Sequence, residues 1–199
     1  HGGGDLIFSD DQMSACLARN LAVTGVTQPW YRSATLPYNP GDFVYSNCDT
    51  MVLGEILWRA TGKNLQAYAD IELFSKIGMT AHWWRDNEAT AQVNGNYLAY
   101  CCLDATPRDF AKFGQLLLNN GTWNNEQIIP ASYIESIKNI ISTSNINGSA
   151  GYLSYGLQFW TILPAWMAGG DIYPAPNTLY SAIGFDGQYI TIDYDLKMV

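Results

Sequence analysis

Basic residues and histidines are scarce in this sequence. Its 199 residues include 10 Lys and Arg against 18 Asp and Glu, and the formal net charge at pH 7 is −8. A chain of this charge is repelled by a nucleic-acid backbone and is not attracted to an anionic membrane surface. The sequence also lacks an apolar run long enough to cross a bilayer. We therefore expect neither nucleic-acid binding nor a membrane span.

Metal-binding patterns are missing as well. The two histidines, His1 and His82, lie far apart in the sequence, and no pair of cysteines has the C-x-x-C spacing of a zinc site. The two adjacent cysteines cannot easily bridge each other without strain, because a disulfide requires a specific geometry. We expect them to be small core residues. The four cysteines are Cys16, Cys48, Cys101 and Cys102.

The two ends of the sequence do not look like the ends of a domain. The chain starts without methionine in a glycine-rich stretch, "HGGGDLIFSD", and it stops in "GQYITIDYDLKMV", where apolar and polar residues alternate as in a half-buried strand. A strand at such a position normally has further strands beside it. We expect an internal fragment of a longer protein.

Helix signals are clear in the first two thirds of the chain. A short helix is expected in "QMSACLARNL", and another from about Thr50 to Ala60, with Asn47 or Asp49 as its cap and Gly62 just beyond its end. The next helix is expected in "LQAYADIELFSKIGM", where Asn64 has the position of the cap.

A further helix has the most complete start signal. In "TPRDFAKFGQLLLNNG", Thr106 has the position of the cap, Pro107 is the first helical residue, Asp109 lies three residues after the cap and Gly121 ends the segment. The expected buried stripe consists of Phe110, Phe113, Leu117 and Leu118. One more helix is expected in "PASYIESIKNI".

The composition changes after about residue 145. "NINGSAGYLSYGLQFWTI" and "NTLYSAIGFDGQYITIDYD" are rich in Gly, Tyr, Ile and Thr, which is typical of strands joined by turns. Helices followed by antiparallel strands predict an α+β fold.

One stretch raises the question of function. In "GDFVYSNCDTMVLGEILWRATGK", Tyr45 lies two residues before Asn47, just ahead of an apolar helix-like run. Taken alone, Tyr45 fits a packed aromatic residue and Asn47 fits a helix cap. The segments that follow favour a chemical role.

These segments occur in a characteristic order. The phrase "VYSNCDTMVLGEILWRATGK" is followed by "LFSKIGM", "DATPRDFAKFGQLLLNNG", "YGLQFW" and "YSAIGFDGQYITIDYD". The set resembles the serine β-lactamase and penicillin-binding-protein superfamily, in particular its class C-like branch, which includes carboxylesterases, D-aminopeptidases and 6-aminohexanoate-dimer hydrolases. The resemblance extends from about Tyr38 to Val199.

The resemblance implies an incomplete β-lactamase/transpeptidase-like fold. Residues 1–144 would be its mainly helical part, with the Tyr-x-Asn motif, and residues 145–199 would be antiparallel strands of the main sheet. Both would belong to one truncated catalytic domain.

The resemblance also implies roles for individual residues. The nucleophile of this family is the serine of a Ser-x-x-Lys helical turn. Tyr45 would be the acid/base that exchanges a proton with this serine, and Asn47 would orient the substrate carbonyl and the lysine. Phe185, which follows Gly184 on a late strand, would donate its backbone N–H to the oxyanion, and Gly184 would bind the substrate beside it. Taken alone, Gly184 and Gly187 fit a turn between two strands, and the two interpretations are compatible.

The sequence departs from the family at two points. No serine is followed three residues later by lysine, so the nucleophile lies outside this sequence or does not exist. Ala182 occupies the position where β-lactam-recognising relatives usually have Lys or His, and this favours an ester or simple amide over a β-lactam. Four further residues, Trp83, Trp84, Asp86 and Trp160, either border the acyl pocket or pack in a core or loop.

The resulting expectation is a serine hydrolase that forms an acyl-enzyme on a small ester or amide, without a metal or organic cofactor. The chain alone would be inactive, and its missing amino-terminal segment would be its partner. The alternative is a non-catalytic binding or regulatory protein that kept the fold and lost the Ser-Lys pair. Family relatives are often exported, so we expect a periplasmic or secreted protein, with the cytoplasm as the alternative location.

Overall fold

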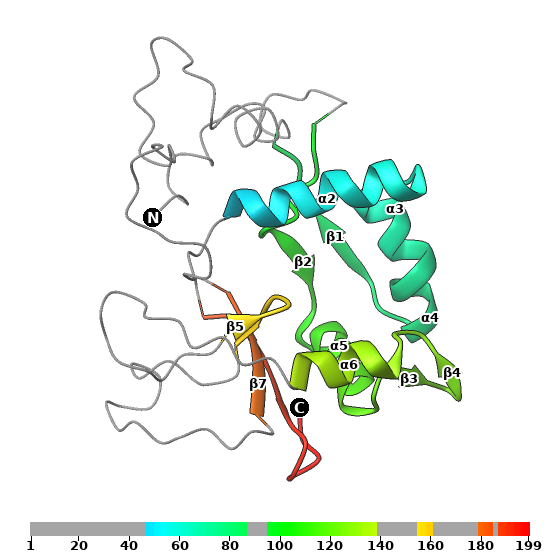
Figure 1. The fold of residues 1–199 in the computed structure, drawn as a ribbon, viewed down its shortest axis with the longest axis vertical. Helices are drawn as coiled ribbons and strands as arrows, with labels where there is room; N and C mark the ends of the chain where they lie inside the picture. The colour runs from blue at the N-terminus through cyan, green and yellow to red at the C-terminus, as the bar shows by residue number, and fades with distance from the viewer. Residues whose placement is uncertain (1–46, 87–94, 139–154, 161–178, 185–186) are drawn as a thin grey trace. The chain divides into compact units, whose positions relative to one another are not determined.

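The computed structural model describes residues 47–86, 95–138, 155–160, 179–184 and 187–199 (Figure 1). The helix expected in "QMSACLARNL" lies outside these residues. The helices are α2 (Asn47–Thr61), α3 (Leu65–Ala69), η3 (Asp70–Phe74), α4 (Ser75–Ile77), α5 (Pro107–Leu118) and α6 (Ala131–Lys138). The strands are β1 (Ala81–Trp83), β2 (Leu103–Ala105), β3 (Thr122–Trp123), β4 (Glu126–Gln127), β5 (Tyr155–Gly156), β6 (Phe159–Trp160), β7 (Leu179–Ile183) and β8 (Tyr189–Asp193).

The chain divides into two units, each of which is described by itself. The described residues of the first unit lie within 47–71 and 81–104, and those of the second lie within 72–80 and 105–199. Helices and small antiparallel sheets together confirm the predicted α+β class. In the part of the chain that the structure describes, no helix combines the length and the hydropathy that crossing a bilayer requires.

Helix α2 confirms the helix expected from residue 50 to residue 60, but it begins earlier. Asn47 and Asp49 lie in its first turn, so neither is the residue before the helix. An acidic side chain in a first turn is favourable because it faces the positive end of the helix dipole. Gly62 follows the helix with φ 71°, a conformation that glycine adopts without steric cost.

The second predicted cap is confirmed in detail. The side chain of Asn64 accepts a hydrogen bond of 2.8 Å from the backbone N–H of Ala67, and this starts α3. The helical run continues through the π-helical turn η3 into α4. It ends at Gly78, which has the left-handed conformation expected after a helix.

In the first unit, residues 81–86 pair with a later segment of the chain, and a loop in that segment interrupts the pairing. The backbone N–H of Trp84 donates to the carbonyl of Cys102 (3.0 Å), while the carbonyl of Trp84 accepts from the N–H of Leu98 (3.0 Å). Residues 99–101 are therefore looped out of the ladder. Cys101 closes this loop by donating its N–H to the carbonyl of Leu98 (3.1 Å).

The 98–102 loop packs against α2 and forms the core of the first unit. The buried residues are Met51, Cys48 and Leu98, with residues 99–102 packed against them. Gly54 permits the close approach, since a Cβ atom at this position would lie 3.1 Å from the Cβ atom of Ala99.

In the second unit, the predicted cap at the start of α5 is confirmed. The hydroxyl oxygen of Thr106 accepts from the N–H of Asp109 (3.2 Å), and the hydroxyl donates to the carboxylate of Asp109 (2.6 Å). Pro107 is the first helical residue, as expected. After the helix, Gly121 has φ 79°, and a Cβ atom there would collide with the carbonyl oxygen of Ile129.

The predicted buried stripe of α5 is only partly right. Leu117 and Leu118 are buried as expected, but Phe110 and Phe113 are half-buried, and Leu116 is fully buried. Helix α5 packs on β8 through a face that includes Gly114, where an added Cβ atom would collide with Val199 and lie 3.0 Å from Ile190, whereas Leu116 lies on the opposite face of the helix. The pattern of apolar residues in the sequence does not predict this close contact between the helix and the strand.

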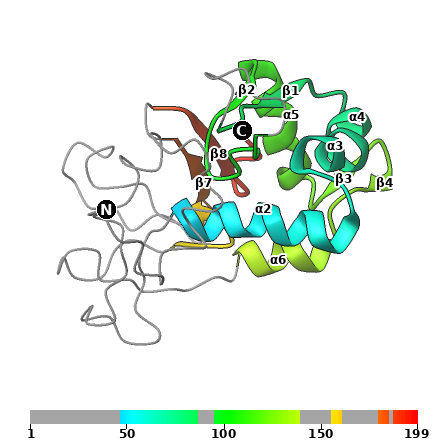
Figure 2. The same ribbon diagram turned by 90° about the horizontal axis from the view of Figure 1, so that it is seen from above.

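A four-stranded antiparallel sheet forms the rest of the second unit, in the order β5-β6-β7-β8. The strands expected in the last part of the chain are thus confirmed where the structure describes them. Figure 2 shows β7 and β8, which pair along their whole length. Helices α5 and α6 contribute residues to the apolar core on this sheet. The buried residues of this core are Leu117, Leu118, Ile134, Ile137, Phe159, Tyr180 and Ile192.

Two tyrosines, buried Tyr180 and half-buried Tyr194, join this sheet to the ends of both helices. The hydroxyl of Tyr180 donates to the carbonyl of Lys138 at the end of α6 (2.6 Å), and that of Tyr194 donates to Leu117 near the end of α5 (2.9 Å). Burial raises the pKa of both phenols, that of Tyr194 to about 12. Both groups therefore remain protonated donors at neutral pH.

Asp109 links the start of α5 to the segment that precedes β1. Its carboxylate accepts from the hydroxyl of Thr106, from the ammonium group of Lys112 (2.9 Å) and from the backbone N–H of Thr80 (3.3 Å). Lys112 also donates to the carbonyl of Gly78. The hydrogen bond from Thr106, followed by that from Lys112, lowers the pKa of Asp109 to about 2.

The lowered pKa of Asp109 predicts a specific loss of stability in acid. A carboxylate with a depressed pKa in the folded state contributes stability above its ordinary value of 3.8, and this is lost as the pH falls towards 2. We expect the urea midpoint of the wild type to fall between about pH 4 and pH 2. Asp109→Asn should be less stable at neutral pH and show a flatter profile in this window.

Asp195→Asn is the matched control, because Asp195 is exposed in the same unit. This variant should keep the steep acid profile of the wild type. A profile of Asp109→Asn as steep as that of the wild type would show that Asp109 is not the responsible group.

Candidate active site

Asn47, the predicted orienting residue, lies at the start of α2 and is half-buried. Its position in the first turn corrects the alternative in which it precedes the helix as a cap. Packing through Cys48, in the same turn, and Met51, one turn later, fixes this end of α2 against the 98–102 loop. Tyr45, the predicted acid/base, lies outside the described residues.

Gly184, predicted to bind substrate, begins the turn between β7 and β8. Its N–H donates to the carbonyl of Gln188 (2.8 Å), and its carbonyl accepts from the N–H of Gly187 (3.2 Å), which has φ 90°. The interpretation of both glycines as turn residues is confirmed. Phe185, whose N–H was predicted to bind the oxyanion, lies outside the described residues.

Trp83, the first predicted pocket residue, ends β1 and is half-buried. Its backbone N–H donates to the side-chain oxygen of Gln66 (2.8 Å), and the amide nitrogen of Gln66 donates to the carbonyl of Ala81 (3.0 Å). The same nitrogen donates to Asp70 (2.8 Å). The Gln66 side chain therefore holds β1 on helix α3. No motif in the sequence predicts this role.

Trp160, the second predicted pocket residue, ends β6 and is half-buried. Its ring makes an edge-to-face contact with Tyr155, with 4.8 Å between the ring centroids and an angle of 63°. Trp160 also pairs with Ser181 of β7. Packing within the sheet accounts for these contacts.

The predicted site residues are divided between the two units. Asn47 and Trp83 belong to the first, and Gly184 and Trp160 belong to the second. The structure thus gives each residue a definite local setting within its own unit. His82 lies in β1, and the described residues include no group of three or more His, Cys, Asp or Glu that could hold a metal ion.

The expectation for Cys101 and Cys102 is wrong. The two adjacent residues are joined by a disulfide, with 3.7 Å between their Cα atoms. Cys102 has φ 66°, the left-handed conformation, which is unusual for a residue other than glycine. The looped-out backbone of residues 99–101 provides the local geometry that an extended chain would not have.

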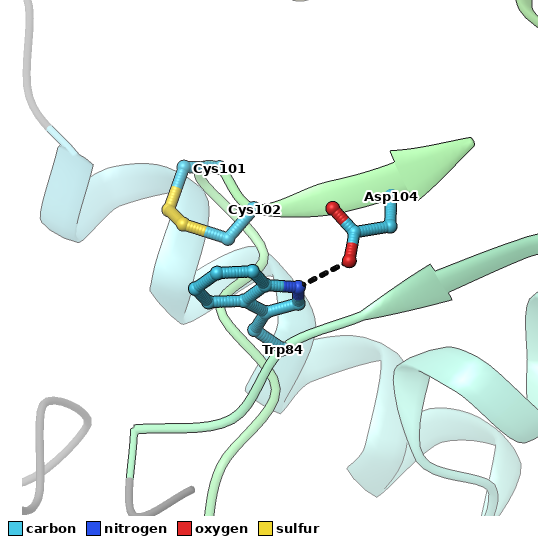
Figure 3. The surroundings of a disulfide bond; sticks show 4 residues. All are labelled: Trp84, Cys101, Cys102 and Asp104. Atoms are coloured by element: carbon cyan, nitrogen blue, oxygen red, sulfur yellow. Dashed lines mark hydrogen bonds between the residues drawn. A yellow bond between two sulfur atoms is a disulfide. The ribbon is translucent and has the colours of Figure 1, made fainter. Parts of the chain in front are cut away.

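Trp84 lies beside this disulfide (Figure 3). Its indole N–H donates to the carboxylate of Asp104 (2.6 Å), and its backbone N–H donates to Cys102. Trp84 is 48% exposed, so it lies at the surface instead of filling a core. The adjacency of the two cysteines was the only sequence signal for this arrangement.

The chain is similar to two solved structures in the serine β-lactamase/transpeptidase-like superfamily. One, from Bacillus anthracis, is provisionally assigned as a 6-aminohexanoate-dimer hydrolase; it is 34% identical, with a TM-score of 0.63, over 78% of this chain and 36% of its own length. The other, from Bacteroides dorei DSM 17855, is provisionally assigned as a β-lactamase; it is 18% identical, with a TM-score of 0.59, over 92% of this chain and 53% of its own length.

These similarities confirm the resemblance that the sequence predicted, and they confirm a β-lactamase-like fold. No protein-family model and no curated protein matches the chain. The chain spans about a third of the length of the first solved structure and about half that of the second.

Gln66 provides a test of how β1 is positioned. Gln66→Ala removes two hydrogen bonds between α3 and β1 and should lower the free energy of unfolding by about 1–3 kcal/mol. Urea denaturation measures this loss, and amide hydrogen exchange at Trp83 should become faster. Gln66→Glu keeps an acceptor for Trp83 but removes the donor to Ala81, and it should also destabilise the chain.

Gln115→Ala is the control, because the Gln115 amide donates within one helical surface, to Asn119 (3.0 Å). This variant should change stability by about 0.5 kcal/mol or less. Equal effects of Gln66→Ala and Gln115→Ala would contradict a special role of Gln66.

Proposed function

We propose that this chain is part of a serine hydrolase that forms an acyl-enzyme on an ester or simple amide. The observation that carries the proposal is the 34% identity to the Bacillus anthracis protein over most of this chain. The name of that protein refers to the hydrolysis of a 6-aminohexanoate dimer, whose two units are joined by an amide bond. A related reaction on a small amide or ester is therefore the simplest proposal.

The start of α2 supports a role for the Tyr-x-Asn motif. Asn47 is half-buried in the first helical turn, and the packing of Met51 holds this end of the helix in place. A positioned amide can donate to a substrate carbonyl and accept from a lysine ammonium group. Tyr45, two residues earlier, would accept the proton of the serine nucleophile and return it to the leaving group.

The turn after β7 supports the role proposed for Phe185. Gly184 and Gly187 form the turn that contains this residue, and the N–H of Gly184 is already bonded to Gln188. The next N–H along the turn, that of Phe185, would serve with the N–H of the nucleophile as the oxyanion donor.

The setting of Ala182 supports an ester or amide substrate over a β-lactam. The residue is half-buried and packs against the core cluster that contains Tyr180 and Ile192. A lysine at this position would bring a charge towards an apolar core, which is costly without a partner. With alanine at position 182, this residue provides no cation to bind the carboxylate that a β-lactam carries.

The proposed role of Tyr45 is testable in the full-length protein that contains this chain. Tyr45→Phe should lower kcat by a factor of about 10² to 10⁴, because it removes the group that moves the proton. Hydrolysis of a chromogenic short-chain ester and of a linear 6-aminohexanoate dimer measures the effect. Circular dichroism should show an intact fold.

Tyr68→Phe is the matched control, since Tyr68 is a half-buried tyrosine of α3. It should keep nearly normal turnover. Turnover of Tyr45→Phe close to that of the control would refute the assigned role. Absence of turnover in the wild-type protein on any ester or amide would instead favour the non-catalytic alternative.

The isolated chain of 199 residues should not turn over these substrates, because no serine in it precedes a lysine by three residues. Steady-state assays of the purified chain, with the full-length protein as the positive control, measure this. Sustained turnover that disappears in Tyr45→Phe would show that the nucleophile lies within the chain.

A further inference from the structure

The disulfide between Cys101 and Cys102 has no role in the proposed reaction. It lies in the 98–102 loop, which interrupts the ladder beside β1 and packs against α2. The bond closes a ring between neighbouring residues, so it contributes almost nothing to restraining the unfolded chain, in contrast to a disulfide that closes a long loop. Global stabilisation is therefore a poor explanation for it.

Cys101 and Cys102 are more accessible to solvent than Cys48, the third described cysteine. Cys101 and Cys102 are half-buried, whereas Cys48, which is also disulfide-bonded, is 4% exposed in the core under α2. Thiol–disulfide exchange requires a thiolate to reach a sulfur atom, so access decides which bond reacts first. Exposed disulfides are the labile ones in proteins.

The bond is also connected to neighbouring structure on both sides. On one side, the Trp84 backbone donates to Cys102, and its indole lies beside the disulfide (Figure 3). On the other side, residues 99–102 pack against the buried Met51 of α2. Cys102 has a left-handed conformation, which is unfavourable for a residue other than glycine and requires restraint by its surroundings.

We propose that the Cys101–Cys102 disulfide is a reversible redox site, and that its reduction loosens the 98–102 loop and the adjoining turns of α2. The reductant is a dithiol. One of its thiolates attacks a sulfur atom and the S–S bond breaks to give a mixed disulfide; its second thiol then displaces the remaining protein thiolate. Two electrons and two protons pass to the protein, which gains two thiols, and the reductant becomes a cyclic disulfide.

The loosening follows from the removal of a covalent restraint. When the ring opens, Cys102 can leave the left-handed conformation, and the packing of the loop on Met51 is no longer fixed by the bond. The amides of α2 next to this contact should then exchange faster with solvent, while the second unit should not change.

The first experiment measures the order of reduction in the native chain of 199 residues. The chain is incubated with increasing concentrations of dithiothreitol, thiols are blocked with iodoacetamide, and the labelled peptides are identified by mass spectrometry. Cys101 and Cys102 should be unlabelled without reductant and labelled together at a lower dithiothreitol concentration than Cys48. Labelling without reductant, or labelling of Cys48 first or simultaneously, would overturn the proposal.

The second experiment measures hydrogen exchange at the dithiothreitol concentration at which only Cys101 and Cys102 are labelled. Exchange in peptides of α2 should rise severalfold, with no change in peptides of α5. The control is the Cys101→Ser/Cys102→Ser variant, which retains Cys48 and should exchange quickly in α2 with or without reductant. Unchanged exchange in the reduced wild type would refute the coupling to α2.

Discussion

The packing of Met51 against the 98–102 loop is the contact on which the candidate catalytic helix depends. Met51 is fully buried, and together with Cys48 and Leu98 it makes the core of the first unit. This core is small, and it lies one turn from Asn47. The position of the Asn47 side chain is therefore set by a few apolar contacts and by the backbone conformation of a disulfide-closed loop.

The second unit is held in a different way. Its larger apolar core, between two helices and the sheet, is supplemented by polar groups at the helix ends: Asp109 and Thr106 at the start of α5, and the phenols of Tyr180 and Tyr194 at the ends of α6 and α5. Thr106 accepts from a backbone N–H in the first turn of α5, Tyr180 donates to the last carbonyl of α6, and Asp109 accepts from the backbone N–H of Thr80. The residues at the turn after β7 thus rest on a scaffold that is braced by both packing and hydrogen bonds.

Features decided by local chemistry were predictable from the sequence. The caps at Asn64 and Thr106 and the glycine after α2 depend on interactions within four residues, and all three are confirmed. Features decided by distant contacts were not. The close approach of Val199 and Ile190 to Gly114 joins residues far apart in the chain, and the bond between Cys101 and Cys102 depends on a loop that pairs with a segment about fifteen residues earlier.

For the candidate site, the family resemblance was predictable because the order of the motifs can be read from the sequence alone. Which residues pack against each other cannot be read in this way. The similarity to two hydrolase-named structures confirms this resemblance. Asn47 and Gly184 are described, in the settings of a helix start and a strand turn, whereas Tyr45 and Phe185 lie outside the described residues. Their roles remain predictions, since a proton shuttle and an oxyanion donor are defined by distances to a nucleophile.

The Gln66 side chain has a consequence for association between molecules. A strand at the edge of a sheet presents N–H and C=O groups on which a strand of another chain can add. In β1 these groups are the N–H of Trp83 and the C=O of Ala81, and one glutamine amide, with its own donor and acceptor, bonds to both. A single side chain of α3 thus takes the place of a neighbouring strand and protects this short sheet from edge-to-edge aggregation.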